Sequence, residues 1–133
     1  MINVVTQSAT ATTQVVTADC TEKLCQPYCV NASIQPVVDV EYSVESTSLV
    51  GTILYVTVKA QGSISYVPKC GCACSPKSKL FTEYFTTSFA GATGASTVAV
   101  TQDAGQVKAA YVNCYNVACG ISAQNVVTLT FTA

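Results

Sequence analysis

Residues 38–45 read VDVEYSVE, a strict alternation of apolar with acidic or polar residues, and this stretch decides the fold class. Side chains that alternate with a period of two lie on opposite faces of a β-strand. The segment is therefore expected to form a half-buried strand with one apolar and one acidic face. Its acidic residues, Asp39, Glu41 and Glu45, are interpreted as a solvated polar face, in preference to an acid/base pair or a calcium site.

Segments of the same kind follow along the chain. A central strand is expected at 49–59, the dipeptide Gln61-Gly62 indicates a turn, and further strands are expected at 63–67, 81–89, 97–101, 106–112 and 126–132. The 133 residues include 20 valines and 18 threonines, which favour strands over helices. The sequence predicts an all-β fold, a single β-sandwich of Greek-key or jelly-roll type with about seven to eight strands.

Residues 1–19 carry a single charge, Asp19, and show no compact apolar pattern. We expect them to form an extended N-terminal arm, followed by one cysteine-bearing β-sandwich domain at 20–133. A frayed terminus is the ordinary interpretation of such a segment. Four valines favour an assembly arm that adds a strand to a neighbouring subunit's sheet edge: Val4, Val5, Val15 and Val16.

Charge and composition exclude several functions. Charged residues make up 10% of the chain, the net charge is −1, and there is no histidine, tryptophan or arginine. Serine–histidine triads, histidine metal sites and arginine clamps on phosphate cannot be built from this chain alone. The six lysines form no basic face for nucleic acid, and no apolar run is long enough to span a membrane. We expect no enzyme activity, cofactor, small-molecule substrate, nucleic acid or membrane insertion.

The eight cysteines fall into three groups: Cys20, Cys25 and Cys29; Cys70, Cys72 and Cys74; Cys114 and Cys119. An even number in a small chain favours a disulfide framework. Cysteines two residues apart on a strand are poorly placed to form a disulfide with each other, so the middle group is expected to pair with a distant group. We expect at least three bridges, with one through the first group crossing between subunits. Zinc bound by two four-cysteine sites is the alternative, and free thiols are a third.

The first seven residues contain no recognisable signal peptide, so either a signal peptide has been removed or the protein is made in a cytosol without one. A protein made without a signal peptide can still acquire disulfides if the cell that makes it later lyses. This predicts an extracellular location, or the surface of a spore or virion. The cysteines Cys20, Cys25 and Cys29 after the arm, together with the valine- and threonine-rich body, resemble the cysteine-containing subunits of bacterial endospore appendages. That resemblance implies a short β-sandwich that assembles with copies of itself. The family's usual paired cysteines near the initiator Met are absent here.

A second resemblance covers residues 38–133. The segments 51–56, 64–67 and 80–89 are similar to the strand order of β domains in clostridial spore-coat proteins, with the Cys70–Cys74 segment as an insertion at a hairpin tip. We therefore expect a structural subunit that self-assembles into an extracellular fibre or spore-surface appendage through disulfides and strand addition. The alternatives are a phage virion component, such as a capsid decoration or tail protein, and a cysteine-based zinc-binding module.

Overall fold

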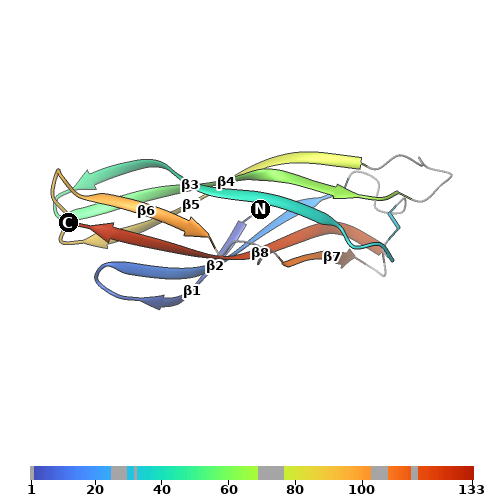
Figure 1. Cartoon of the computed structure of the whole chain (residues 1–133), viewed down its shortest axis with the longest axis horizontal. Coiled ribbons are helices and arrows are strands. Elements are labelled where there is room, and N and C mark those ends of the chain that lie inside the picture. The colour runs from blue at the N-terminus through green and yellow to red at the C-terminus, as the bar shows by residue number, and fades with distance from the viewer. Residues whose placement is uncertain (1, 25–29, 32, 69–76, 103–107, 115–116) are drawn as a thin grey trace.

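The computed structural model describes residues 2–24, 30–31, 33–68, 77–102, 108–114 and 117–133, and within these ranges it contains eight strands and no helix (Figure 1). The predicted all-β class is confirmed. The strands are β1 Ile2–Ala9, β2 Thr13–Lys23, β3 Val37–Val50, β4 Ile53–Tyr66, β5 Lys77–Ala90, β6 Thr97–Gln102, β7 Lys108–Cys114 and β8 Val117–Thr132.

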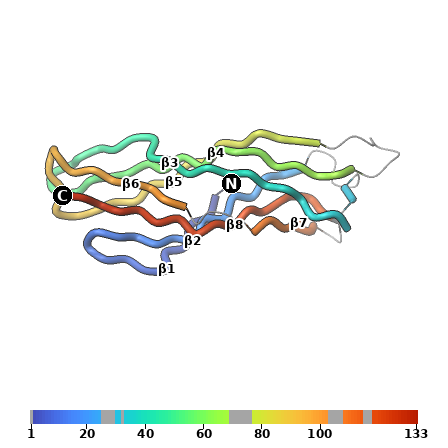
Figure 2. Tube along the Cα trace, viewed as in Figure 1, coloured from blue at the N-terminus to red at the C-terminus, as the bar shows by residue number. Residues whose placement is uncertain are grey.

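The strands form two antiparallel sheets. One is the three-stranded meander β3-β4-β5, and the other has five strands in the order β1-β2-β8-β6, with β7 also paired to β8. The 16-residue strand β8 pairs with β2 along one edge. On its other edge, β8 pairs with β6 near its C-terminal end and with β7 near its N-terminal end. These long strands give the molecule its elongated shape (Figure 2).

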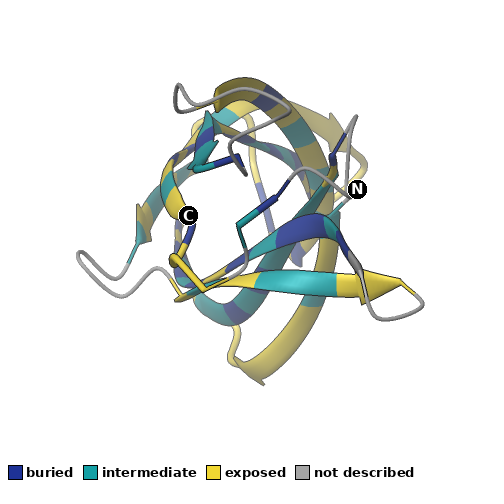
Figure 3. Ribbon diagram, turned by 90° about the vertical axis from the view of Figure 1, so that its right-hand side faces the viewer, coloured by how far each residue is buried: buried dark blue, intermediate teal, exposed yellow. Residues whose placement is uncertain are grey.

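The two sheets enclose one apolar core. Viewed along the long axis, their strands surround a common centre, and buried residues occur on strands around it (Figure 3). Alternate residues of β2, β4 and β8 face inward, as the period of two requires. The rings of Phe89 on β5 and Phe131 on β8 stack across the core with their centroids 5.1 Å apart. The fully buried side chains include Val16, Val56, Val58, Ile121, Val127 and Leu129.

The side chain of Gln102 joins the two sheets where β6 passes β3. Its Nε2 donates to the Val40 carbonyl at 2.8 Å, and its Oε1 accepts from the Tyr42 amide, also at 2.8 Å. One amide side chain thus makes the two hydrogen bonds that a neighbouring strand would otherwise make. β3 is an edge strand, and Gln102 satisfies its backbone in the middle of the molecule.

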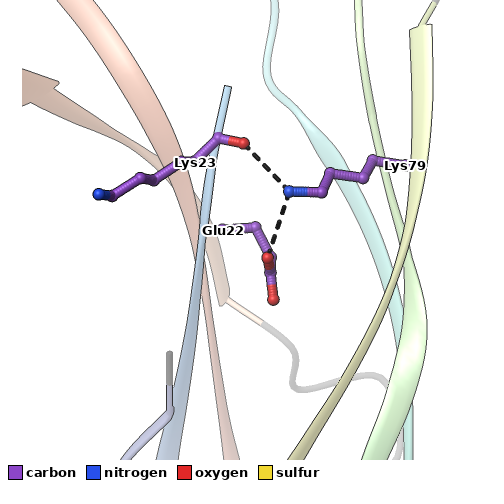
Figure 4. A network of polar contacts seen from close by, with 3 residues as sticks. All are labelled: Glu22, Lys23 and Lys79. Atoms are coloured by element: carbon purple, nitrogen blue, oxygen red, sulfur yellow. Dashed lines mark hydrogen bonds and ion pairs between the residues drawn. The ribbon is translucent and has the colours of Figure 1, made fainter. Parts of the chain in front are cut away.

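Polar side chains also connect β2 with β5, the other outer strand of the three-stranded sheet. Gln14 Nε2 donates to the Ser88 carbonyl at 2.8 Å. Further along, Lys79 Nζ lies 3.5 Å from Glu22 Oε2 and 3.3 Å from the Lys23 carbonyl (Figure 4). Polar contacts therefore tie the two sheets together at both outer strands of the three-stranded sheet, β3 and β5.

The N-terminal segment differs from the expected extended arm. Residues 2–9 and 13–23 form a hairpin, and β2 pairs with β8 in continuous register from Thr13 to Lys23. Inward-facing residues of β2 belong to the core, with Val16 2% and Ala18 0% exposed. The apolar pattern of 1–19 is sparse because β2 contributes only one narrow row of small side chains to the core.

The predicted turn at Gln61-Gly62 is wrong, because β4 runs through both residues without a break. The turn lies instead between β3 and β4 at Gly51, whose φ of +63° is accessible to glycine at little cost. Gly62 has a different role, since a Cβ there would lie 1.8 Å from the Asp39 carbonyl oxygen. Its glycine permits a close approach of β3 and β4 and is not a turn signal.

Candidate functional site

The free edge of β1 is the surface best suited to bind another strand. β1 pairs with β2 along its inner side and, among the described strands, with no other. Residues 5–9 are all exposed, and a bulge interrupts the ladder between Thr6 and Ser8. An edge of this kind presents backbone N–H and C=O groups that a further strand can pair with.

The sequence of β1 lacks the features that usually protect such an edge. Soluble proteins place lysine, other charged residues or proline on exposed edge strands to prevent pairing with other chains. Residues 2–18 contain no charged residue and no proline. Val5 projects from this edge strand with 65% of its surface exposed. The bulge at Gln7 is the one protective feature, and it limits the regular part of the strand to residues 2–6.

The structure separates the four valines of the predicted assembly arm. Val16 is buried in the core, and Val4 is half-buried against it. Val15 is half-buried on β2, opposite Thr128 of β8. Only Val5 remains as an exposed apolar side chain, so the part of residues 1–19 available for assembly is β1, and the rest belongs to the domain.

Cys20 is a buried free thiol and not a member of a disulfide in this structure. It is 1% exposed, and its Sγ lies 3.6 Å from the Tyr42 hydroxyl. Burial raises the pKa of the Cys20 thiol and also that of the Tyr42 phenol. The expected disulfide through Cys20, whether within the chain or to another subunit, is therefore not what the structure has, because β2 directs this side chain into the core.

Cys114, the last residue of β7, and Cys119, near the start of β8, form a disulfide with a Cα–Cα distance of 5.6 Å. The sequence placed both in a disulfide framework but did not pair them with each other. With these two cysteines bridged, six remain, which is enough for one four-cysteine zinc site but not for two. Five other predicted disulfide or metal residues lie outside the described part of the chain: Cys25, Cys29, Cys70, Cys72 and Cys74.

The outer face of the three-stranded sheet carries the predicted acidic row. Asp39 and Glu41 border an open hollow of about 430 Å³, beside the exposed side chain of Leu80. Further along the face, Glu45 lies 3.8 Å from Lys59. Near the β3–β4 turn the same sheet has a second exposed apolar group, formed by Val50, Ile53 and Tyr55.

Sequence reasoning missed the polar residues that work inside the molecule. Gln102 and Gln14 hold the sheets together, yet a glutamine at the end of a strand resembles any solvent-facing residue. Asn125 is 2% exposed, and neither polar atom of its amide has a protein partner among the described residues. In the sequence, Asn125 stands two residues before the alternating apolar residues Val127, Leu129 and Phe131, and the strand was expected to begin only at residue 126.

Searches against protein-family models, curated proteins and solved structures find no match to this chain. Within the described ranges, no three cysteine, aspartate or glutamate side chains come together in a way that could hold a metal ion. No helix in that part of the molecule could cross a membrane. The function is therefore inferred from the surface and the disulfide.

Proposed function

We propose that this protein is a structural, self-assembling subunit of an extracellular fibre or spore-surface appendage. The observation that carries the proposal is the outer edge of β1, which is uncharged, is exposed from Val5 to Ala9, and pairs with no described strand. A free edge without protective charges is a hazard for a protein that works as a monomer. The same edge is an advantage in a subunit that assembles by strand addition.

The Cys114–Cys119 disulfide supports the location outside a reducing cytosol. A covalent link between subunits, expected from the first cysteine group, now rests on Cys25 and Cys29, which lie outside the described residues. The burial of Cys20 makes it unsuitable for that link. The proposed fold is a sandwich of Greek-key or jelly-roll type, and the single core between the two sheets supports its sandwich part.

The proposal is tested by the assembly state of the purified full chain. Negative-stain microscopy and sedimentation velocity should reveal oligomers or fibres of the wild type. The variant Val5→Lys adds a charge to the free edge and should reduce assembly without unfolding the domain, because Val5 is 65% exposed.

Val37→Lys is the matched control, since Val37 is 67% exposed but lies on β3. It should assemble like the wild type. A wild-type chain that stays monomeric at all concentrations, or a Val5→Lys variant that assembles as well as Val37→Lys, would contradict assembly through β1.

A further inference from the structure

The sequence of β1 is close to symmetric about its most exposed apolar residue. Residues 3–7 read NVVTQ, with Val5 at the centre. On either side of Val5 stand the β-branched residues Val4 and Thr6, which have nearly the same shape. Beyond them stand Asn3 and Gln7, which both end in a carboxamide. The order of side-chain types is therefore the same in both directions along the strand.

Two copies of such a segment fit each other in antiparallel orientation. An antiparallel pair about a two-fold axis at one residue places residue i+k opposite residue i−k of the other copy. With the axis at Val5, Val5 meets Val5, Val4 meets Thr6, and Asn3 meets Gln7. Each of these is a favourable cross-strand neighbour, since carboxamides can exchange hydrogen bonds and β-branched side chains pack together.

We propose that the strand that pairs with β1 is β1 of a second copy, in antiparallel register about a two-fold axis at Val5. This inference rests on the proposed function, because it names the partner of the same edge. The pairing joins two five-stranded sheets into one continuous sheet. Because a two-fold contact closes at a dimer, the dimer is the building unit, and growth into a fibre needs a second contact elsewhere on the subunit. It also covers the exposed side chain of Val5 with its own counterpart.

The contacts within one subunit are compatible with this register. Val5 pairs with Thr17 and Asn3 with Asp19 on β2, so the inner side of β1 is already occupied. The Gln7 side-chain amide donates to Thr17 Oγ1, which holds that side chain on the same face of the sheet as Thr17. The bulge at Gln7 ends the regular ladder at the edge of the symmetric segment. Within the symmetric segment, residues 3–6 therefore lie in the regular part of the edge, and Gln7 lies at the bulge that ends it.

A charge exchange at Val5 tests the pairing. Val5→Lys alone and Val5→Asp alone each place like charges opposite each other across the two-fold axis. Each should lower the assembled fraction by about tenfold or more. An equimolar mixture of the two variants places lysine opposite aspartate and should recover most of the wild-type assembly. The readout is sedimentation velocity at low salt and again at high salt, where the recovery should weaken.

The variants Val37→Lys and Val37→Asp serve as the matched controls, separately and mixed, and should assemble like the wild type. Circular dichroism and protection of the Cys20 thiol from alkylation verify that each variant is folded.

If both Val5 variants lose assembly and their mixture does not recover it, β1 pairs with a different edge. The β1–β1 register is then wrong, while the proposed function stands. If the Val5 variants assemble as well as the wild type, both the β1–β1 register and assembly through β1 are wrong. A monomeric wild type overturns the proposed function, and the register with it.

Discussion

Replacing Gln102 with alanine should destabilise the domain more than any other change of a partly exposed polar side chain in the described structure. The substitution removes two hydrogen bonds of 2.8 Å, and it leaves the Val40 carbonyl and the Tyr42 amide without partners. Both residues are at least 95% buried, with Val40 4% and Tyr42 5% exposed. The loss of two such hydrogen bonds, with both backbone partners left unpaired, should lower the free energy of unfolding by about 2–4 kcal/mol.

The assay is urea denaturation followed by circular dichroism with the disulfide intact, from which the free energy of unfolding is obtained by linear extrapolation. Gln124→Ala is the matched control. Gln124 is exposed on β8, and its amide makes one 3.4 Å contact with Asp19, so its loss should cost less than about 0.5 kcal/mol. If the two variants lose equal stability, Gln102 is not what holds β3 to β6, and the account of the sheet edges is wrong.

Three further changes test other parts of the structure. Gly62→Ala should cost about 3 kcal/mol, because the new Cβ meets the Asp39 carbonyl oxygen, whereas Gly94→Ala should cost little since nothing lies within 4 Å; urea denaturation measures both. The Cys20 thiol should react with iodoacetamide at pH 8 about 100-fold more slowly in the native chain than after unfolding, because burial shields the thiol and raises its pKa. Peptide mapping by mass spectrometry measures both rates, and equal rates would contradict the burial of Cys20. Burial also raises the pKa of Tyr42 above its ordinary value of 10.0, so the unfolded chain loses this proton first. The free energy of unfolding should therefore fall as pH rises above 10.0. Tyr42→Phe should weaken this pH dependence, and an unchanged dependence in the variant would show that Tyr42 is not its source.

The all-β class could be predicted because it depends on local periodicity. The alternation at 38–45 places Val40 and Tyr42 inward and Asp39 and Glu41 outward, and the structure has this arrangement. The turn at Gln61-Gly62 was mispredicted because a glycine that makes a turn and a glycine that lets two strands approach closely give the same signal in the sequence. Whether it makes a turn or allows two strands to approach depends on the partner strand, which local sequence does not contain.

The candidate site could be predicted only in part, for the same reason. Residues 1–19 pointed to strand addition, and Val5 is exposed as that idea requires. Val16 looked equivalent to Val5 in the sequence, yet it is buried because β8, more than 100 residues later, pairs with β2. The side chains of Cys20, Gln14 and Gln102 also acquire their roles from other strands, with partners 22, 74 and 60–62 residues away in the sequence. Long-range pairing therefore limits what sequence patterns reveal about this surface.

The position of β8 in the chain has a consequence for biosynthesis. The meander β3-β4-β5 needs only its own residues, so it can begin to form while later residues are still being added. Among the described strands, β6 and β7 pair with β8 alone, and β2 pairs with β8 along the edge that β1 leaves free; β8 is synthesised after the other seven strands. Until it emerges, β2 has an open side, and the unprotected β1–β2 hairpin is exposed at both edges. Neighbouring nascent chains could pair with that hairpin, so the speed with which β8 inserts between β2 and β6 decides whether a chain reaches its native state before it meets another.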